Sequence, residues 1–417
     1  MSAMKILALG GPGAMGAVAV RVAAGLPGVT EIVVADRRLE AAEELVRRLG
    51  GRGTAMRPAK VDVTDDAALR AVLRDADVVL NAVGPYYRFG MTVLSAAIAT
   101  GTHYLDICDD WEPTQRMLGL DEEARAAGVC AVVGMGASPG MSNLLAARAV
   151  EQLDQVRDLY TAWPVDVPGD SGQDDSGQDD EQLVDPDGRP GAAVVHWMEQ
   201  ISGKVAVVSA GRLVHRQPLQ PVFLALSETC SGTAYTVGHP EPVTLHSSFR
   251  PTGNAANLMV VTPGTLAYLD VLRRDIDAGR LTNETAAADL AKPSTSRALR
   301  ATVRAMRLKG PGSLPPFFAA ATGTRGGRPV TVLARLAESP GTPGLIDNMA
   351  EATGIPLALG LAQLVDHSRR RPGVHPPETV IDPGRFFQDL VRHVPALARD
   401  GAAPGGVTIE VTEAGRR

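Results

Sequence analysis

A glycine-rich turn near the N-terminus constrains the fold of this chain more than any other feature. Residues 11–16 have the sequence GPGAMG, directly after the apolar run MKILAL and directly before a helical pattern. Glycines at this GxGxxG spacing permit a tight turn, a close backbone approach to a pyrophosphate, and close packing of the helix on the strand. The helix start adds free N–H groups and a partial positive charge. The phosphate-binding residues expected from this pattern are Gly11, Gly13, Ala14, Met15 and Gly16.

The end of the expected second strand bears on the choice of dinucleotide. Asp36 closes that strand twenty positions after Gly16, where a carboxylate can accept hydrogen bonds from the adenosine ribose hydroxyls. Arg37 and Arg38 follow, and a guanidinium there could hold a 2′-phosphate or stack on the adenine. Because Asp36 would repel that phosphate, we expect NAD rather than NADP, while the arginines leave NADP open.

The first 150 residues have the pattern of a parallel sheet. Short apolar runs alternate with helical stretches, and several runs are apolar on consecutive residues, as strands buried on both faces require. We therefore expect an α/β fold in which residues 1–150 form a Rossmann domain with a doubly wound parallel sheet. Its fourth strand ends at Asn81, close to Gly84 and Pro85, at the edge where such sheets bind ligands. Asn81 either contacts the cofactor or caps the loop.

A second domain is expected over residues 151–342. The segments 193–221 and 234–247 are typical of β-hairpins, and 317–336 predicts two strands joined across Gly326 and Gly327. Helical patterns at 265–278 and 295–308 interrupt them. These features predict an α+β substrate-binding domain with a largely antiparallel sheet. We expect residues 343–417 to be a helical tail that packs back on the first domain.

An acidic repeat interrupts the second domain. Residues 170–179 have the sequence DSGQDDSGQD, which offers no apolar side chain for burial. We interpret it as a solvated surface insertion, because like charges repel one another, with a lid over a site as the alternative.

Composition excludes several classes of partner. The formal charge of -6 gives no basic field for a nucleic acid backbone, so a small-molecule partner fits better. No apolar run reaches about 18 residues, so no membrane span is expected. Three scattered cysteines suggest neither a disulfide framework nor a zinc site, and no metal-binding constellation is apparent. A strand begins almost at once, which leaves no room for a signal peptide, so we expect a cytoplasmic protein.

The chain resembles the saccharopine dehydrogenase family. The likeness is carried by the stretches NAVGPYYRFG (81–90), HYLDICDD (103–110), GMGASPGMSNLLA (134–146), GHPEPVTL (238–245) and GVHPPETVIDPGRFFQDL (373–390). This resemblance implies an NAD(P)-linked oxidoreductase acting on a C–N bond of an amino-acid-derived amine or imine. It also implies a Rossmann domain completed by the C-terminal tail, and homodimers formed through the second domain. One departure is Ser138, at a position where many members carry aspartate.

Imine reduction needs a hydride donor, a proton for nitrogen, and charges that orient the substrate. Asp106, Asp109 and Asp110 follow the expected fifth strand at its carboxyl end. We expect Asp106 and Asp109 to relay a proton or hold a substrate ammonium. Asp110 either binds substrate or caps the helix that follows.

A second candidate group lies in the second domain, between Gly238 and Pro242. His239 beside Glu241 can shuttle a proton near neutral pH, so we expect a catalytic His239 and a substrate-binding Glu241. The alternative is a turn with exposed polar side chains. Arg250 is the nearby candidate for binding a substrate carboxylate, or else a surface arginine.

Two other functions remain open from the sequence. One is an aminoalkyl transferase of the homospermidine-synthase type, which would use NAD transiently. The other is a protein that binds the dinucleotide without redox turnover. We favour the oxidoreductase because a separate substrate domain and an acidic strand end are both expected.

Overall fold

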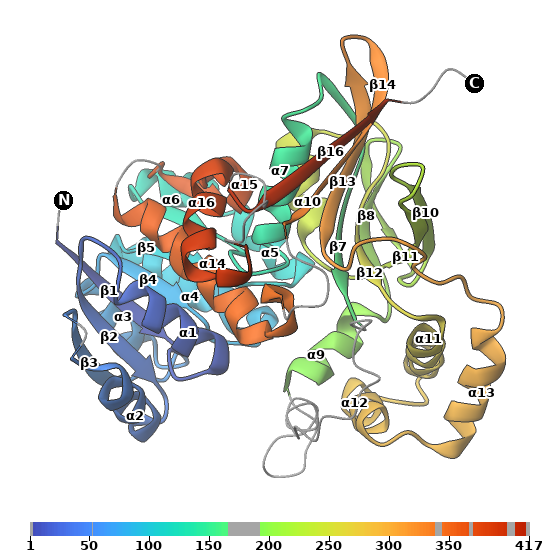
Figure 1. Ribbon diagram of the computed structural model, residues 1–417. Coiled ribbons are helices and arrows are strands. Elements are labelled where there is room, and N and C mark those ends of the chain that lie inside the picture. The colour runs from blue at the N-terminus through green and yellow to red at the C-terminus, as the bar shows by residue number, and fades with distance from the viewer. Residues whose placement is uncertain are drawn as a thin grey trace. The chain divides into compact units, whose positions relative to one another are not determined.

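The chain folds into two compact units. The computed structural model describes residues 3–51, 53–165, 192–337, 344–366, 370–397 and 405–413, so the acidic repeat at 170–179 lies outside the described residues. The first unit comprises Met1–Arg148 and Leu336–Ile409, and the second comprises Ala149–Arg335 and Glu410–Arg417. Figure 1 shows the elements of both units.

The first unit contains a seven-stranded parallel sheet in the order β15-β6-β5-β4-β1-β2-β3. Its strands are β1 (Met4–Leu9), β2 (Val29–Asp36), β3 (Ala55–Lys60), β4 (Val78–Asn81), β5 (His103–Asp106), β6 (Cys130–Val132) and β15 (Gly373–His375). The order 3-2-1-4-5-6 is that of a Rossmann sheet, and the chain reverses direction across the sheet between β1 and β4. The expected doubly wound fold is therefore confirmed, and β15 from the C-terminal part adds a seventh strand beside β6.

Helices cover this sheet. They are α1 (Ala14–Ala23), α2 (Leu39–Leu49), α3 (Asp66–Arg74), α4 (Tyr86–Thr100), α5 (Trp111–Leu118), α6 (Asp121–Ala126), α7 (Met141–Val150), α14 (Met349–Val365), α15 (Pro377–Val380) and α16 (Pro383–His393). Two short 3-10 turns, η1 (Leu345–Asp347) and η2 (Pro395–Leu397), flank the later helices. The orange-red α14 packs on the blue α1 although the two are far apart in the sequence (Figure 1). The helix that opens the Rossmann unit is therefore buttressed by the C-terminal part of the chain.

The second unit is built on a nine-stranded sheet. The strand order is β10-β11-β12-β7-β13-β14-β16. In addition, β8 pairs with β12, and β9 pairs with β8. The strands are β7 (Gln155–Pro164), β8 (Val205–Ser209), β9 (Arg212–Arg216), β10 (Pro221–Ala225), β11 (Ser231–Thr236), β12 (Ala255–Val260), β13 (Phe318–Arg325), β14 (Arg328–Leu336) and β16 (Val407–Glu413). The β7–β12 pair is parallel, whereas β13 pairs antiparallel with both β7 and β14. A largely antiparallel α+β unit was expected, and the hairpin across Gly326 and Gly327 is confirmed.

The helices that accompany this sheet in the described residues are α9 (Ala192–Gln200), α10 (Glu241–Phe249), α11 (Pro263–Asp277), α12 (Asn283–Ala291) and α13 (Thr295–Ala305). In the described part of the chain, no helix is both long and apolar enough to span a membrane.

Two helices replace expected strands. Residues 192–200, which include His196 and Trp197, form α9 rather than part of a hairpin. Val194, Met198 and Ile201 are buried there, which is helical spacing. Residues 241–249 form α10 instead of a strand. Proline suits the first turn of a helix but cannot donate to a strand ladder, and Pro240 and Pro242 flank this helix start.

Candidate cofactor and substrate sites

The glycine turn has the geometry of a phosphate-binding loop. A Cβ on Gly16 would lie 2.5 Å from the Gly10 carbonyl oxygen, so only glycine lets α1 pack this closely on the turn. Gly11 and Gly16 are buried, whereas Gly13 and Ala14 are exposed. Gly13 is the N-cap of α1 and makes no side-chain capping bond. The backbone N–H groups of the first turn, including that of Met15, therefore remain available to an anion.

The carboxylate of Asp36 is engaged in the turn that follows β2. Its Oδ1 accepts a hydrogen bond of 2.9 Å from the backbone N–H of Arg38, and Arg38 Nε lies 3.8 Å away. Arg38 is the N-cap of α2, so Asp36 fixes the start of that helix. Arg37 and Arg38 are exposed beside it, at the end of β2 where an adenosine ribose would lie.

The loop after β4 is organised by a buried asparagine. Asn81 is fully buried and its Oδ1 accepts a hydrogen bond from the Val83 N–H at 3.1 Å. Its Nδ2 donates to the Tyr104 hydroxyl at 3.0 Å. The amide of Asn81 therefore supports the loop, which favours the loop-capping alternative. Gly84 is exposed and Pro85 half-buried, so this backbone lies at the surface next to β1.

Asp106 is enclosed by the protein. It is fully buried, and its carboxylate accepts hydrogen bonds from the Tyr104 hydroxyl at 2.7 Å, the Gly134 N–H at 2.7 Å and the Cys108 N–H at 3.1 Å. Burial raises the pKa of Asp106 to about 6, and these three donors oppose that rise. The expected catalytic role is not supported by this setting, because its oxygens are occupied by loops after β5 and β6. Asp106 is better interpreted as a positioning residue.

Burial also governs the other titratable groups around Asp106. It raises the pKa of the Tyr86 and Tyr104 hydroxyls and of the Cys108 thiol. All three groups therefore stay protonated near neutral pH, and Cys108 lacks the thiolate character that a nucleophile needs.

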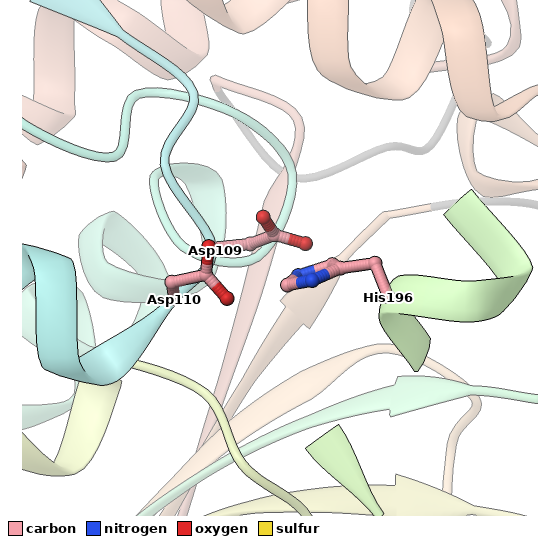
Figure 2. Close-up of side chains that lie close together, drawn as sticks. All are labelled: Asp109, Asp110 and His196. Atoms are coloured by element: carbon pink, nitrogen blue, oxygen red, sulfur yellow. The ribbon is translucent and has the colours of Figure 1, made fainter. Parts of the chain in front are cut away.

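Asp109 and Asp110 lie on the loop between β5 and α5, and both are half-buried. Figure 2 shows their side chains projecting from this loop. Asp110 occupies the N-cap position of α5, but its side chain makes no capping hydrogen bond, while its backbone oxygen accepts from the Thr114 N–H at 3.1 Å. Both carboxylates therefore lie beyond the carboxyl end of β5, and their role toward a ligand stays a prediction.

The second unit contains a buried polar network around His239, which we call the His239 network. Asn257 joins its members. The Trp163 indole N–H donates to Asn257 Oδ1 at 2.8 Å, and Asn257 Nδ2 donates to Glu241 Oε1 at 2.7 Å and to the Thr161 hydroxyl at 3.0 Å. The second oxygen of Glu241 lies 3.5 Å from His239 Nδ1, and the Trp163 and His239 ring centroids are 5.3 Å apart.

This network is enclosed rather than displayed on an exposed turn. Glu241 and Asn257 are fully buried, and only 5% of His239 is exposed. Asn257 Nδ2 holds one oxygen of Glu241, and the other oxygen lies 3.5 Å from His239 Nδ1. The arrangement can orient the imidazole for proton exchange through Nε2.

Arg250 is separated from the His239 network. It is the C-cap residue of α10, whereas Glu241 begins that helix. Nine helical residues span roughly 13 Å, so the structure does not bring Arg250 beside His239. Its side chain is exposed and its φ is 48°. The surface alternative for Arg250 is therefore favoured over carboxylate binding next to His239.

The sequence-based prediction missed the residues that hold the candidates in place. Tyr104 lies two residues before Asp106 on the same face of β5, a period-2 relation visible in the sequence. Asn257 could have been singled out as the one polar residue in the otherwise apolar run AANLMV of β12. Nothing in the sequence indicated that Trp163 pairs with it.

The N-terminal part of the first unit matches a known domain family. Residues 6–132 match the family model described as the saccharopine dehydrogenase NADP binding domain. The expected resemblance is thereby confirmed for this domain. A "Saccharopine dehydrogenase [NADP(+), L-glutamate-forming]" from Pyricularia oryzae is 30% identical over 123 residues, which are 30% of this chain and 25% of that protein. The protein with the same description from Saccharomyces cerevisiae is 30% identical over 122 residues, 29% of this chain and 25% of its own length.

The whole chain shares the fold of a solved saccharopine dehydrogenase. The apo histidine-tagged saccharopine dehydrogenase (L-Glu forming) from Saccharomyces cerevisiae superposes with a TM-score of 0.61, covering 99% of this chain and 100% of that chain at 15% identity. This likeness confirms the fold class, a Rossmann unit together with a second α+β unit. The sequence similarity is concentrated in the NADP binding domain, and the match spans only a quarter of the curated relatives' length.

These comparisons bear on the expected cofactor. The matched domain is described as NADP binding, and both curated relatives are named for NADP(+). The expected preference for NAD over NADP is therefore not supported. In this chain the exposed side chains of Arg37 and Arg38 beside Asp36 are the groups that could hold a 2′-phosphate.

Proposed function

We propose that this protein is an NADP(H)-dependent oxidoreductase that acts on a C–N bond of an amino-acid-derived substrate. The observation that carries the proposal is the match of residues 6–132 to the saccharopine dehydrogenase NADP binding domain, whose glycine turn has the required geometry. The shared overall fold with a saccharopine dehydrogenase is consistent with it.

The cofactor is assigned to the first unit. The pyrophosphate would bind the N–H groups at the start of α1, where Gly13 and Ala14 are exposed and α1 has no side-chain cap. Arg37 is the candidate partner of the 2′-phosphate, since its side chain is exposed beside Asp36, whose Oδ1 accepts a hydrogen bond from the Arg38 N–H. The exposed backbone at Gly84 and Pro85 would border the cofactor at the carboxyl end of β4.

The protein must supply a proton for the imine nitrogen and must orient the substrate. When bound, the dihydronicotinamide ring supplies a hydride to the imine carbon. The imine nitrogen would gain the C=N electron pair and a proton, and the candidate proton donor within the second unit is Nε2 of a doubly protonated His239, which would become the neutral imidazole. Glu241, held by Asn257, orients the imidazole rather than binding substrate, because it is fully buried. Asp109 and Asp110 are the candidates for holding a substrate ammonium.

The proposal is tested by cofactor titration followed by turnover. NADPH should bind more tightly than NADH, and oxidation of NADPH should be followed at the nicotinamide absorbance band with a panel of amino-acid-derived imines. His239→Gln should lower kcat by about 10²-fold or more, the usual size of a general-acid contribution. His215→Gln, at an exposed position of β9, serves as the matched control.

Two results would count against the proposed dehydrogenase activity, and a third would count only against its proton donor. Binding of NADPH without any absorbance change across amines and imines would indicate a dinucleotide-binding protein without redox turnover. Net transfer of an aminoalkyl group without net absorbance change would indicate the transferase. An unchanged kcat in His239→Gln would remove the proton-donor assignment while leaving the dehydrogenase assignment intact.

A further inference from the structure

A basic surface stands out in the second unit of this acidic protein. Residues 292–309 carry six basic side chains and no aspartate or glutamate, although the whole chain has a formal charge of -6. The six are Lys292, Arg297, Arg300, Arg304, Arg307 and Lys309. Helix α13 forms the centre of this segment and packs on α11.

A cavity of about 340 Å³ lies between these two helices, within the size range of small-molecule sites. Its charged lining consists of four arginines and no acid: Arg274, Arg300, Arg304 and Arg307. The remaining lining is apolar and comprises Val271, Val303 and Leu308. We call this feature the arginine cavity.

Two carboxylates hold the arginines in place without neutralising them. Asp270 makes ion pairs with Arg273, Arg274 and Arg304. Asp275 pairs with Arg280, Arg297 and Arg300, at 2.7, 2.9 and 2.6 Å respectively. Asp277 also pairs with Arg273, and Asp289 with Arg297. Six guanidinium groups therefore meet four carboxylates, and the surplus charge is positive. The side chains of Arg274 and Arg300 are still 54% and 49% exposed, so they can reach a ligand.

Apolar side chains lie along the same helix. Leu299, Val303 and Met306 are 67%, 52% and 78% exposed. Positions i, i+4 and i+7 share one face of a helix, so these three form a stripe beside the arginines. An exposed apolar stripe next to a surplus of guanidinium groups marks a binding surface rather than an ordinary solvated face.

We propose that the arginine cavity binds a small organic anion, a phosphate or carboxylate attached to an apolar portion. Guanidinium groups form paired hydrogen bonds with the oxygens of both anions, and Asp270 and Asp275 fix their positions before the ligand arrives. Val303 and Leu308 would contact the apolar portion. The site lies wholly within the second unit, whereas the glycine turn belongs to the first unit, so the two ligands are bound by different residues.

The test uses full-length protein saturated with NADPH, so that the glycine turn is occupied. Calorimetric titrations with n-hexyl phosphate, n-hexanoate and inorganic phosphate separate the contributions of the phosphate, the carboxylate and the apolar chain. Arg300→Gln with Arg307→Gln should weaken binding of the preferred hexyl ligand by about tenfold or more, since a charge-assisted hydrogen bond is worth about that factor. Asp275 retains Arg280 and Arg297 in this variant.

The control variant carries Arg212→Gln and Arg216→Gln, two exposed arginines on β9 of the same unit. It should bind the hexyl ligands like the wild type, and both variants should bind NADPH equally well. Binding should also weaken as salt is raised, because the contact is electrostatic.

Two outcomes would overturn the proposal. The first is that the wild type binds none of the three probes, or that the wild type and the Arg300/Arg307 variant bind all three probes with equal affinity. The second is a dimer in sedimentation that Leu299→Ser with Met306→Ser dissociates, without any hexyl phosphate binding, which would make this face a subunit contact. If the protein fails to bind NADPH at all, the same titrations without NADPH still test the arginine cavity.

Discussion

Gly16 is the residue at which α1 lies closest to the turn that precedes it. In Gly16→Ala the added Cβ would lie 2.5 Å from the Gly10 oxygen and 3.0 Å from Gly11 Cα, both backbone atoms that cannot move alone. We expect a loss of about 1–3 kcal/mol in the free energy of unfolding and weaker NADPH binding. Gly25→Ala is the control, because the nearest atom to its Cβ is at 3.6 Å. Urea unfolding and cofactor titration measure both effects, and equal behaviour of the two variants would contradict this view of the turn.

Asp106 should make stability depend on pH. Burial raises its pKa in the folded protein to about 6 from the ordinary aspartate value of 3.8. The folded state therefore binds this proton more tightly than the unfolded state. The resulting stabilisation is complete below about pH 4 and is lost as the pH rises through about 6, a change of about 3 kcal/mol.

Asp106→Asn removes that titration. The difference in unfolding free energy between wild type and variant should change between pH 4.5 and 7 in favour of the variant, as measured by urea unfolding. A difference that stays constant across this range would show that the carboxylate does not change its protonation there.

Asn257 provides a test of the His239 network. Asn257→Leu removes the amide that donates to Glu241 at 2.7 Å and leaves a buried carboxylate oxygen without that donor. We expect a cost of about 1–3 kcal/mol in unfolding free energy, a lower kcat and a shifted pH–rate profile. A shifted pH–rate profile would indicate that Asn257 positions His239, whereas a purely structural effect would leave the profile unchanged.

Thr161→Val is the control for Asn257, because it removes only the hydroxyl that accepts from Asn257. It should leave the pH–rate profile unchanged. A profile that is the same in both variants would mean that Asn257 does not orient His239 through Glu241.

At the scale of elements, the contact between α1 and α14 links cofactor binding to the C-terminal part. A Cβ on Gly354 of α14 would lie 2.5 Å from the Met15 carbonyl oxygen and 2.7 Å from Val18 Cβ. Gly354→Ala should therefore push α14 away from α1. We expect a net loss of about 1–2 kcal/mol in stability, since the clash exceeds the helix propensity gained, together with weaker NADPH binding.

Gly264→Ala in α11 is the matched control, because no atom lies within 4 Å of its Cβ. It should raise stability by about 0.5–1 kcal/mol without changing NADPH binding. Thermal unfolding with and without NADPH compares the two glycine variants. If Gly354→Ala is more stable than the wild type, α14 can shift without disturbing α1.

The elements also show where sequence patterns suffice. The hairpin of β13 and β14 was predictable because its turn residues Gly326 and Gly327 adopt positive φ values. Helix α9 was not, because its apolar residues AAVV are consecutive at the start and suit a strand as well as a helix. In the structure, Val194 and Met198 are buried on one face, and this burial favours the helix over the strand.

At the scale of the whole molecule, the first unit is assembled from two separate parts of the chain. Residues 336–409 supply β15 beside β6 and α14 against α1. A chain that ends at Arg335 would therefore leave the β6 edge unpaired and α1 without its partner helix. We expect this truncated chain to lose NADPH binding and the cooperative unfolding of its first unit.

Adding residues 336–417 as a separate polypeptide should restore part of the NADPH binding. Fluorescence titration and circular dichroism of the truncated chain, alone and with the added segment, make the comparison. Full NADPH affinity in the truncated chain would show that the dinucleotide site does not need residues 336–417.

The sequence by itself determined the Rossmann unit and the glycine turn, because both depend on local rules: consecutive apolar residues in parallel strands and glycines at fixed spacing. It also predicted that Asp109 and Asp110 follow the fifth strand at its carboxyl end. Tertiary structure alone decided that Asp106 is enclosed and that Arg250 lies away from His239. It also decided that Asn257 accepts a hydrogen bond from Trp163 and donates one to Glu241. These outcomes depend on packing between residues up to about a hundred positions apart, whose distances no spacing rule encodes. The arginine cavity has the same origin, because it forms where α11 and α13 pack together.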